Sequence, residues 1–64
     1  MTAAKRNELH FVIKMIDMRA GSYVEFEVMT ENGPSKRLAF DHMTGKSIIE
    51  SWGDRILSYT FVEK

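Results

Sequence analysis

The segment from Leu9 to Met18, LHFVIKMIDM, constrains the fold of this chain more than any other stretch. It is the longest apolar run, it is rich in β-branched and aromatic residues, and it contains neither Gly nor Pro. These properties are typical of a strand inside a sheet. Apolar side chains occupy both sets of alternating positions, so we predict a strand from about Glu8 to Met18 that is buried on both faces.

The chain has 64 residues, which is enough for one domain with one hydrophobic core. A core of this size gives marginal stability and usually needs a disulfide, a metal ion or a partner chain. The sequence has no cysteine, and His10 and His42 are too few ligands for a zinc site. We therefore expect no metal and no cofactor, and association with another chain in their place.

Nine basic and nine acidic residues give a net charge of zero, and both signs are spread along the whole chain. This distribution argues against a strongly basic nucleic-acid surface. The apolar run begins late and contains Lys14 and Asp17, so it resembles neither a signal peptide nor a membrane span. We expect residues 1–7 to be a flexible terminus, residues 8–64 to be a single α+β domain, and the protein to be cytoplasmic.

Apolar and polar side chains alternate from Tyr23 to Thr30, which predicts a second strand. The turn before it, residues 19–22, contains Gly21, which is free to adopt a positive φ. A hairpin across this turn aligns the apolar faces of the first two strands. The same register places Lys14 opposite Glu27 as a cross-strand ion pair.

The Asn-Gly-Pro sequence at residues 32–34 predicts the next turn. A two-residue Asn-Gly loop would place Leu38 opposite Glu27 and turn the following strand inside out. We therefore expect a three-residue loop or a bulge that pairs Val28 with Leu38, because a slip of one residue exchanges the two faces of a strand. The third strand then runs from about Ser35 to Asp41.

A helix of about two to three turns is expected next, with Thr44 or Ser47 as its N-cap and Gly53 at its end. One face of this helix gathers the apolar residues Ile48, Ile49 and Trp52. A fourth strand is predicted at about residues 55–62. The fold class is α+β: a small β-β-β-α-β domain, with a mostly antiparallel four-stranded sheet in the order 3-2-1-4 and one short helix on one face.

One short helix covers only one face of such a sheet, so the other face is expected to present an apolar patch typical of a protein interface. The residues that we expect to bind a partner there are Val12, Ile16, Met18, Tyr23 and Met29. The predicted function is a small non-enzymatic protein-interaction module, a regulator or inhibitor that forms a homodimer or binds another protein. Its size suits a phage or mobile-element protein, and no membrane partner is expected.

A nucleic-acid-binding regulatory protein is the alternative interpretation. Its candidate contacts are four basic residues that we expect along one edge of the domain: Lys36, Arg37, Lys46 and Arg55. Dimerisation would double this charge, and binding of this kind weakens steeply as salt increases.

Two short motifs suggest chemistry but lack the context that it requires. The string TGKS at residues 44–47 ends like a P-loop, yet Phe40 occupies the position of the first glycine of that motif. At most, the helix N-terminus with Lys46 would bind one anion. Asp41 and His42 resemble an acid–base pair without a nucleophile, so an enzyme, with an active site shared across a dimer, is only the third interpretation.

Overall fold

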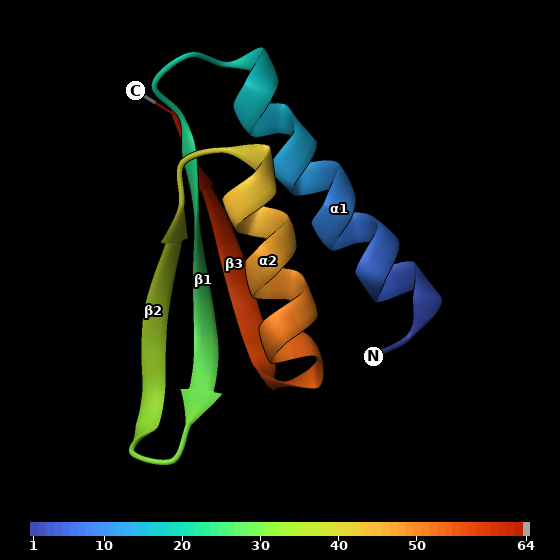
Figure 1. The fold of residues 1–64 in the computed structure, drawn as a ribbon, viewed down its shortest axis with the longest axis vertical. Coiled ribbons are helices and arrows are strands. Elements are labelled where there is room, and N and C mark those ends of the chain that lie inside the picture. The colour runs from blue at the N-terminus through green and yellow to red at the C-terminus, as the bar shows by residue number, and fades with distance from the viewer. Residues whose placement is uncertain (64) are drawn as a thin grey trace.

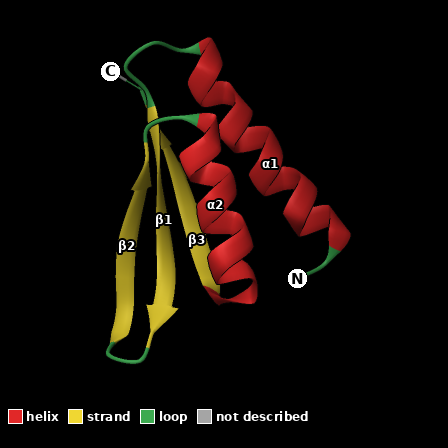
Figure 2. Cartoon of the chain, viewed as in Figure 1, coloured by secondary structure: helices red, strands yellow, loops and turns green. Residues whose placement is uncertain are grey.

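The computed structural model describes residues 1–63 and shows two helices packed on one face of a small sheet (Figure 1). The elements in chain order are α1 (Ala3–Met18), β1 (Tyr23–Thr30), β2 (Gly33–Ala39), α2 (His42–Trp52), a 3₁₀ turn (Gly53–Arg55) and β3 (Ile56–Val62). The three strands form one antiparallel sheet in the order β2-β1-β3 (Figure 2). The α+β class is confirmed, with three strands and two helices in place of the predicted four and one. Lys64, the last residue of the predicted domain, lies outside the described residues.

The segment predicted as the first strand belongs to helix α1, and this is the main correction. Its buried side chains follow the i, i+3, i+4, i+7 spacing of a helix: Leu9, Val12, Ile13 and Ile16. The preceding residues AAKRNE are mostly good helix formers, and the Thr2 hydroxyl accepts a hydrogen bond from the Lys5 amide at 3.2 Å as the N-cap. Residues 3–7, predicted as a flexible terminus, are therefore the first turns of α1.

The bounds of β1 and the positive φ of Gly21 agree with prediction, but the hairpin predicted across residues 19–22 is wrong because α1 and not a strand precedes this turn. Gly21 has a φ of 83°, as expected for the turn, and β1 spans Tyr23–Thr30. The next turn differs, because Thr30 pairs with Gly33 across a two-residue connection. The Thr30 hydroxyl donates to the Gly33 carbonyl at 2.7 Å and accepts from the Asn32 amide at 3.2 Å. Gly33 itself has a φ of 105°, which favours glycine.

This turn overturns the predicted register of the hairpin. Val28 pairs with Ser35 and not with Leu38, so β2 presents the opposite face to the core. Leu38 and Phe40 are 43% and 62% exposed, whereas Ala39 is completely buried. Burial of the small Ala39 side chain leaves room for α2, which packs against β2.

Helix α2 ends at Gly53, as predicted, but begins earlier than expected. Its N-cap is Asp41, whose Oδ1 accepts a hydrogen bond from the Thr44 amide at 2.7 Å. Thr44 and Ser47, the predicted N-caps, lie inside the helix. After α2, strand β3 returns to pair with β1 on the side that the predicted first strand would have occupied. When the predicted first strand is removed from the predicted order 3-2-1-4, the remaining three strands have the order seen in the structure.

The core lies between the inward face of the sheet and the two helices. The largest completely buried side chains come from α1 and β1: Leu9, Ile13, Val24, Phe26 and Val28. Helices α1 and α2 approach closely at Gly45, which is buried against Ile13. Trp52 and Tyr59 close the core from α2 and β3 and are half-buried.

Candidate interaction surface

The five residues predicted to bind a partner do not share one face of the molecule. Val12 and Ile16 are each only 6% exposed, because they lie on the buried side of α1 rather than on a sheet. Met18 is 77% exposed at the end of α1, and Met29 is 40% exposed at the far end of β1. Tyr23, at the start of β1, is half-buried against Phe40, with ring centroids 5.0 Å apart.

The uncovered face of the sheet is polar at its centre. Glu25 and Glu27 of β1 point to this face, and Lys36 of β2 forms an ion pair with Glu25 at 2.9 Å. The hydrogen bond and negative charge of Glu25 raise the pKa of Lys36. Lys14, the predicted partner of Glu27, lies instead on the exposed side of α1. This face is therefore not the contiguous apolar patch that we predicted.

The two edges of the sheet differ strongly in composition. Strand β2 contains Pro34, which has no N–H to offer a neighbour, together with Lys36 and Arg37. Proline and charged residues are common protections against pairing with another strand. Strand β3, ILSYTFV, has no charged residue, no proline and no glycine over Ile56–Val62. Among residues 1–63 it has a paired strand only on its β1 side. We call its other side the β3 edge.

An apolar row lies on the outer side of α1. Phe11, Met15 and Met18, called the α1 row below, recur at helical spacing one turn beyond Glu8. Phe11 is 66% exposed and Met15 is half-buried. The Tyr59 hydroxyl of β3 donates a hydrogen bond to the Glu8 carboxylate at 2.7 Å, and this bond raises the pKa of Tyr59. The contact places Glu8 beside β3, and Met15 is the member of the α1 row that lies closest to the Glu8 side of the helix, whereas Phe11 and Met18 point further toward solvent.

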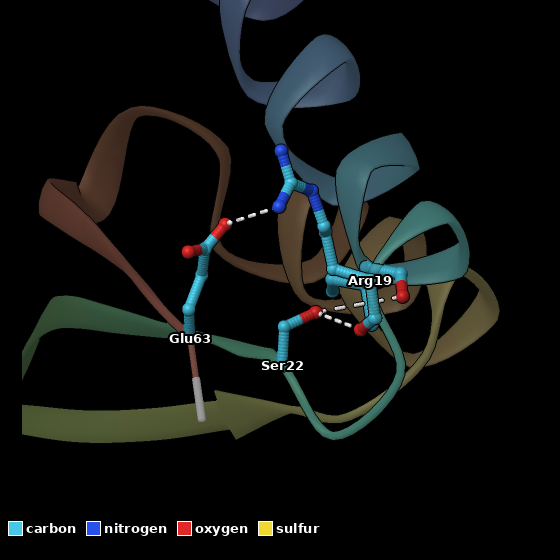
Figure 3. Close-up of polar contacts among 4 residues, drawn as sticks. Arg19, Ser22 and Glu63 are labelled. Atoms are coloured by element: carbon cyan, nitrogen blue, oxygen red, sulfur yellow. Dashed lines mark hydrogen bonds and ion pairs between the residues drawn. The ribbon is translucent and has the colours of Figure 1, made fainter.

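A small polar cluster lies where the end of α1 meets the start of β1 and the end of β3 (Figure 3). The buried Ser22 hydroxyl donates to the Arg19 carbonyl at 2.5 Å, and the Ile16 carbonyl lies 3.5 Å away. The Arg19 guanidinium in turn lies 3.5 Å from the Glu63 carboxylate. Both charged side chains are more than half exposed, so the serine contributes most to the rigidity of this corner.

The four basic residues proposed to bind nucleic acid are divided between two sides of the domain. Lys36 lies on the uncovered sheet face, whereas Arg37 points to the helix side. The guanidinium groups of Arg37 and Arg55 lie 5.2 and 5.0 Å from the centroid of the Trp52 ring. Only these two come together, since Lys46 lies apart on the exposed surface of α2.

The two short motifs have structural roles at the start of α2. The Asp41 carboxylate accepts the Thr44 amide, and this hydrogen bond lowers the pKa of Asp41. It is thus oriented as a helix cap and not toward His42 as an acid–base partner. Gly45 lies inside α2 rather than in a phosphate-binding loop, and its missing side chain makes room for Ile13.

A small cavity of about 220 Å³ is lined by Met1, Arg6, Ile49, Glu50, Gly53 and Asp54. Within residues 1–63, no group of three His, Asp or Glu side chains is placed to hold a metal ion. No helix in this part of the chain has the length and apolar character to cross a bilayer. The cavity lies between the N-terminal end of α1 and the C-terminal end of α2.

The sequence contained a signal for the β3 edge that our interpretation did not use. A seven-residue strand without charge, proline or glycine is unusual at an exposed edge. The α1 row was missed because Phe11 and Met15 were assigned to the core face of a strand.

No protein-family model, curated protein or solved structure matches this chain.

Proposed function

We propose that this chain is a small non-enzymatic protein-binding module, and that its partner adds a strand to the β3 edge. The supporting observation is the contrast between the two edges of the sheet. The β2 edge has proline and charged side chains, whereas the neutral β3 edge has none. Unpaired backbone N–H and C=O groups on an uncharged strand are a template for another strand, and the irregularity of β3 at Leu57 leaves residues 58–62 regularly paired with β1.

The α1 row supplies the apolar contacts that an added strand requires. Backbone hydrogen bonds give affinity in this mode of recognition, and side-chain contacts beside the strand give specificity. Phe11 and Met18 are mostly exposed, so their burial by a partner removes apolar surface from water. Methionine side chains are flexible and adapt to the shape of the surface that they meet.

The test compares three immobilised forms of the chain as baits in a cell lysate. Wild type is compared with Ser58→Lys/Thr60→Lys, which places two charges beside the β3 edge. The matched control is Leu38→Lys, which adds a charge to the β2 strand on the same sheet face. Inside one chain all three positions lie opposite Glu25 or Glu27, so the new lysines face carboxylates and the fold is expected to persist.

The expected result is a protein that wild type and Leu38→Lys retain and the double variant releases. Tagged copies of the chain itself are added to the lysate, so that self-association is detected in the same way. Quantitative mass spectrometry of the three eluates measures this difference. Identical sets of retained proteins on all three baits would refute the role of the β3 edge. Circular dichroism spectra of the baits establish that each is folded.

A nucleic-acid-binding function is the second candidate, and one observation favours it. Arg37 and Arg55 both lie against Trp52, so two cations and an aromatic ring meet at one place. Retention of the chain on heparin or DNA, falling steeply as salt is raised, is the expected behaviour of such a site. Arg37→Gln/Arg55→Gln should then elute at lower salt than wild type, while Lys46→Gln should elute close to it. Passage of wild type through the column at low salt excludes this candidate.

A further inference from the structure

We infer that the partner of the β3 edge is a second copy of this chain, paired antiparallel with β3 over the full length of the strand. The inference rests on the proposed function, because it names the partner of the same edge. A domain of this size without a disulfide commonly gains stability by association. An antiparallel pair of identical strands closes with twofold symmetry and leaves no further β3 edge exposed.

Full-length pairing fixes the register. Tyr59 then lies opposite Tyr59 of the second copy, at the centre of the strand Ile56–Val62. Ser58 lies opposite Thr60, and Leu57, the bulged residue of β3, lies beside Phe61, so a hydroxyl pair and an apolar pair form on each side of the axis. Both kinds of cross-strand pair stabilise an antiparallel ladder. A shift of the register would shorten the pairing and expose strand ends.

The charges that flank β3 complement each other in this register. Arg55 immediately precedes the strand and Glu63 immediately follows it. Antiparallel pairing centred on Tyr59 brings Arg55, the last residue of the 3₁₀ turn, to the same end of the paired strands as Glu63 of the second copy, and twofold symmetry repeats this pair at the other end. The strand interior is neutral, so the two ion pairs set both the direction and the register of the two strands.

Both charged groups are accessible for these contacts. Arg55 is exposed and lies against the Trp52 ring, while the Glu63 side chain is 51% exposed. The contact of Glu63 with Arg19, at 3.5 Å between exposed side chains, contributes little to stability and is easily exchanged. Met15 of the α1 row lies two turns from Glu8 on the same side of the helix, so it adds apolar surface on the side of α1 that contacts β3.

Sedimentation velocity of the purified chain tests the inference. Wild type is expected to sediment as a dimer at tens of micromolar. Ser58→Lys/Thr60→Lys is expected to sediment as a monomer, because the ammonium groups introduced in opposite copies would be adjacent and would repel each other. Leu38→Lys is expected to remain dimeric. A wild-type monomer up to hundreds of micromolar, or a dimer that persists in the double variant, would overturn the inference.

A charge exchange tests the register itself. Arg55→Glu alone places two carboxylates at each end of the paired strands, and Glu63→Arg alone places two guanidiniums there. Each variant is expected to dimerise about tenfold more weakly than wild type. An equimolar mixture of the two should form heterodimers as readily as wild type forms dimers, because both ends then pair opposite charges. A mixture no better than its components would overturn the predicted register.

These measurements separate the two proposals. A monomeric wild type whose capture of another protein still depends on the β3 edge would reject the second copy as partner and leave the proposed function supported. A dimer whose charge exchange behaves as expected supports both proposals, even when the lysate yields no other partner. If the Ser58→Lys/Thr60→Lys substitutions change neither the capture of proteins from lysate nor dimerisation, both the proposed function and the second copy as partner are rejected.

Discussion

Gly45 of α2 faces Ile13 of α1 so closely that a β-carbon at Gly45 would lie 2.5 Å from Ile13 Cγ2. The methyl group that it would meet is attached directly to Ile13 Cβ, so it has little freedom to move. We expect Gly45→Ala to lower the free energy of unfolding by about 1–2 kcal/mol, since overpacking outweighs the better helix propensity of alanine. Urea denaturation measures the change.

Two further variants establish that the Gly45→Ala effect arises at the helix contact. Ser47→Ala, on the exposed side of the same helix, should leave stability within about 0.5 kcal/mol of wild type. In the Ile13→Ala background, Gly45→Ala should cost clearly less, because the methyl group at 2.5 Å is gone and only the Cβ of residue 13, at 3.0 Å, remains close. Equal effects of Gly45→Ala in both backgrounds would contradict the proposed contact.

The Asp41 cap predicts a specific dependence of stability on pH. Its hydrogen bond from the Thr44 amide lowers the pKa of Asp41 below 3.8, the value expected in the unfolded chain. A lowered pKa in the folded state gives stability that is present above pH 3.8 and is lost as the pH falls through the lowered value. Asp41→Ala should therefore reduce the melting temperature at neutral pH by about 5 °C and should flatten this part of the pH profile.

Asparagine provides the matched control for this cap. Asp41→Asn keeps an oxygen that accepts the Thr44 amide but does not titrate. Its melting temperature at neutral pH should stay close to that of wild type, while its stability should fall less as the pH drops from about 4 to about 2. If Asp41→Asn loses stability with falling pH as steeply as wild type does, other carboxyl groups dominate the loss of stability in acid.

The hydrogen bond between Tyr59 and Glu8 joins the two elements that border the proposed interface. The hydrogen bond stabilises the protonated hydroxyl and therefore raises the pKa of Tyr59 above 10.0. A raised pKa gives stability that is complete below pH 10.0 and is lost as the pH rises through the raised value. Tyr59→Phe should cost about 0.5–1 kcal/mol at neutral pH, and its difference from wild type should shrink in alkaline solution. Glu8→Gln is the control, since an amide oxygen still accepts the bond.

The elements with one strong local pattern were predicted well. Strict alternation defined β1, and Gly53 marked the end of α2, because each signal is decided by a few neighbouring residues. The hairpin register failed because it depends on where the chain turns. We expected a three-residue loop, whereas hydrogen bonds of Thr30 close a two-residue turn at residues 31–32, and every side chain of β2 then lies on the face opposite to the one predicted.

Helix α1 was mistaken for a strand because an apolar run fits both periodicities. Leu9–Met18 fills both faces of a strand, but its buried residues also lie on one side of a helix. Helix formers ahead of Leu9 and the Thr2 cap decide between the two. The predicted site was wrong because it depended on the predicted strand. Val12 and Ile16 lie in the core and not on an exposed surface. The exposure of Met18 and Met29 was predicted correctly, but the two residues do not lie on one shared face as we expected.

Ile16 and Met18 give the sharpest test of helix α1, since the discarded strand would place both on one face. In the helix, Ile16 is 6% exposed within the core and Met18 is 77% exposed. Ile16→Lys should therefore lower the free energy of unfolding by about 3 kcal/mol or more, because it buries an unpaired charge. Met18→Lys should change it by less than about 0.5 kcal/mol. Equal effects of the two substitutions in urea denaturation would contradict the helical assignment, because residues two apart share a face in a strand and not in a helix.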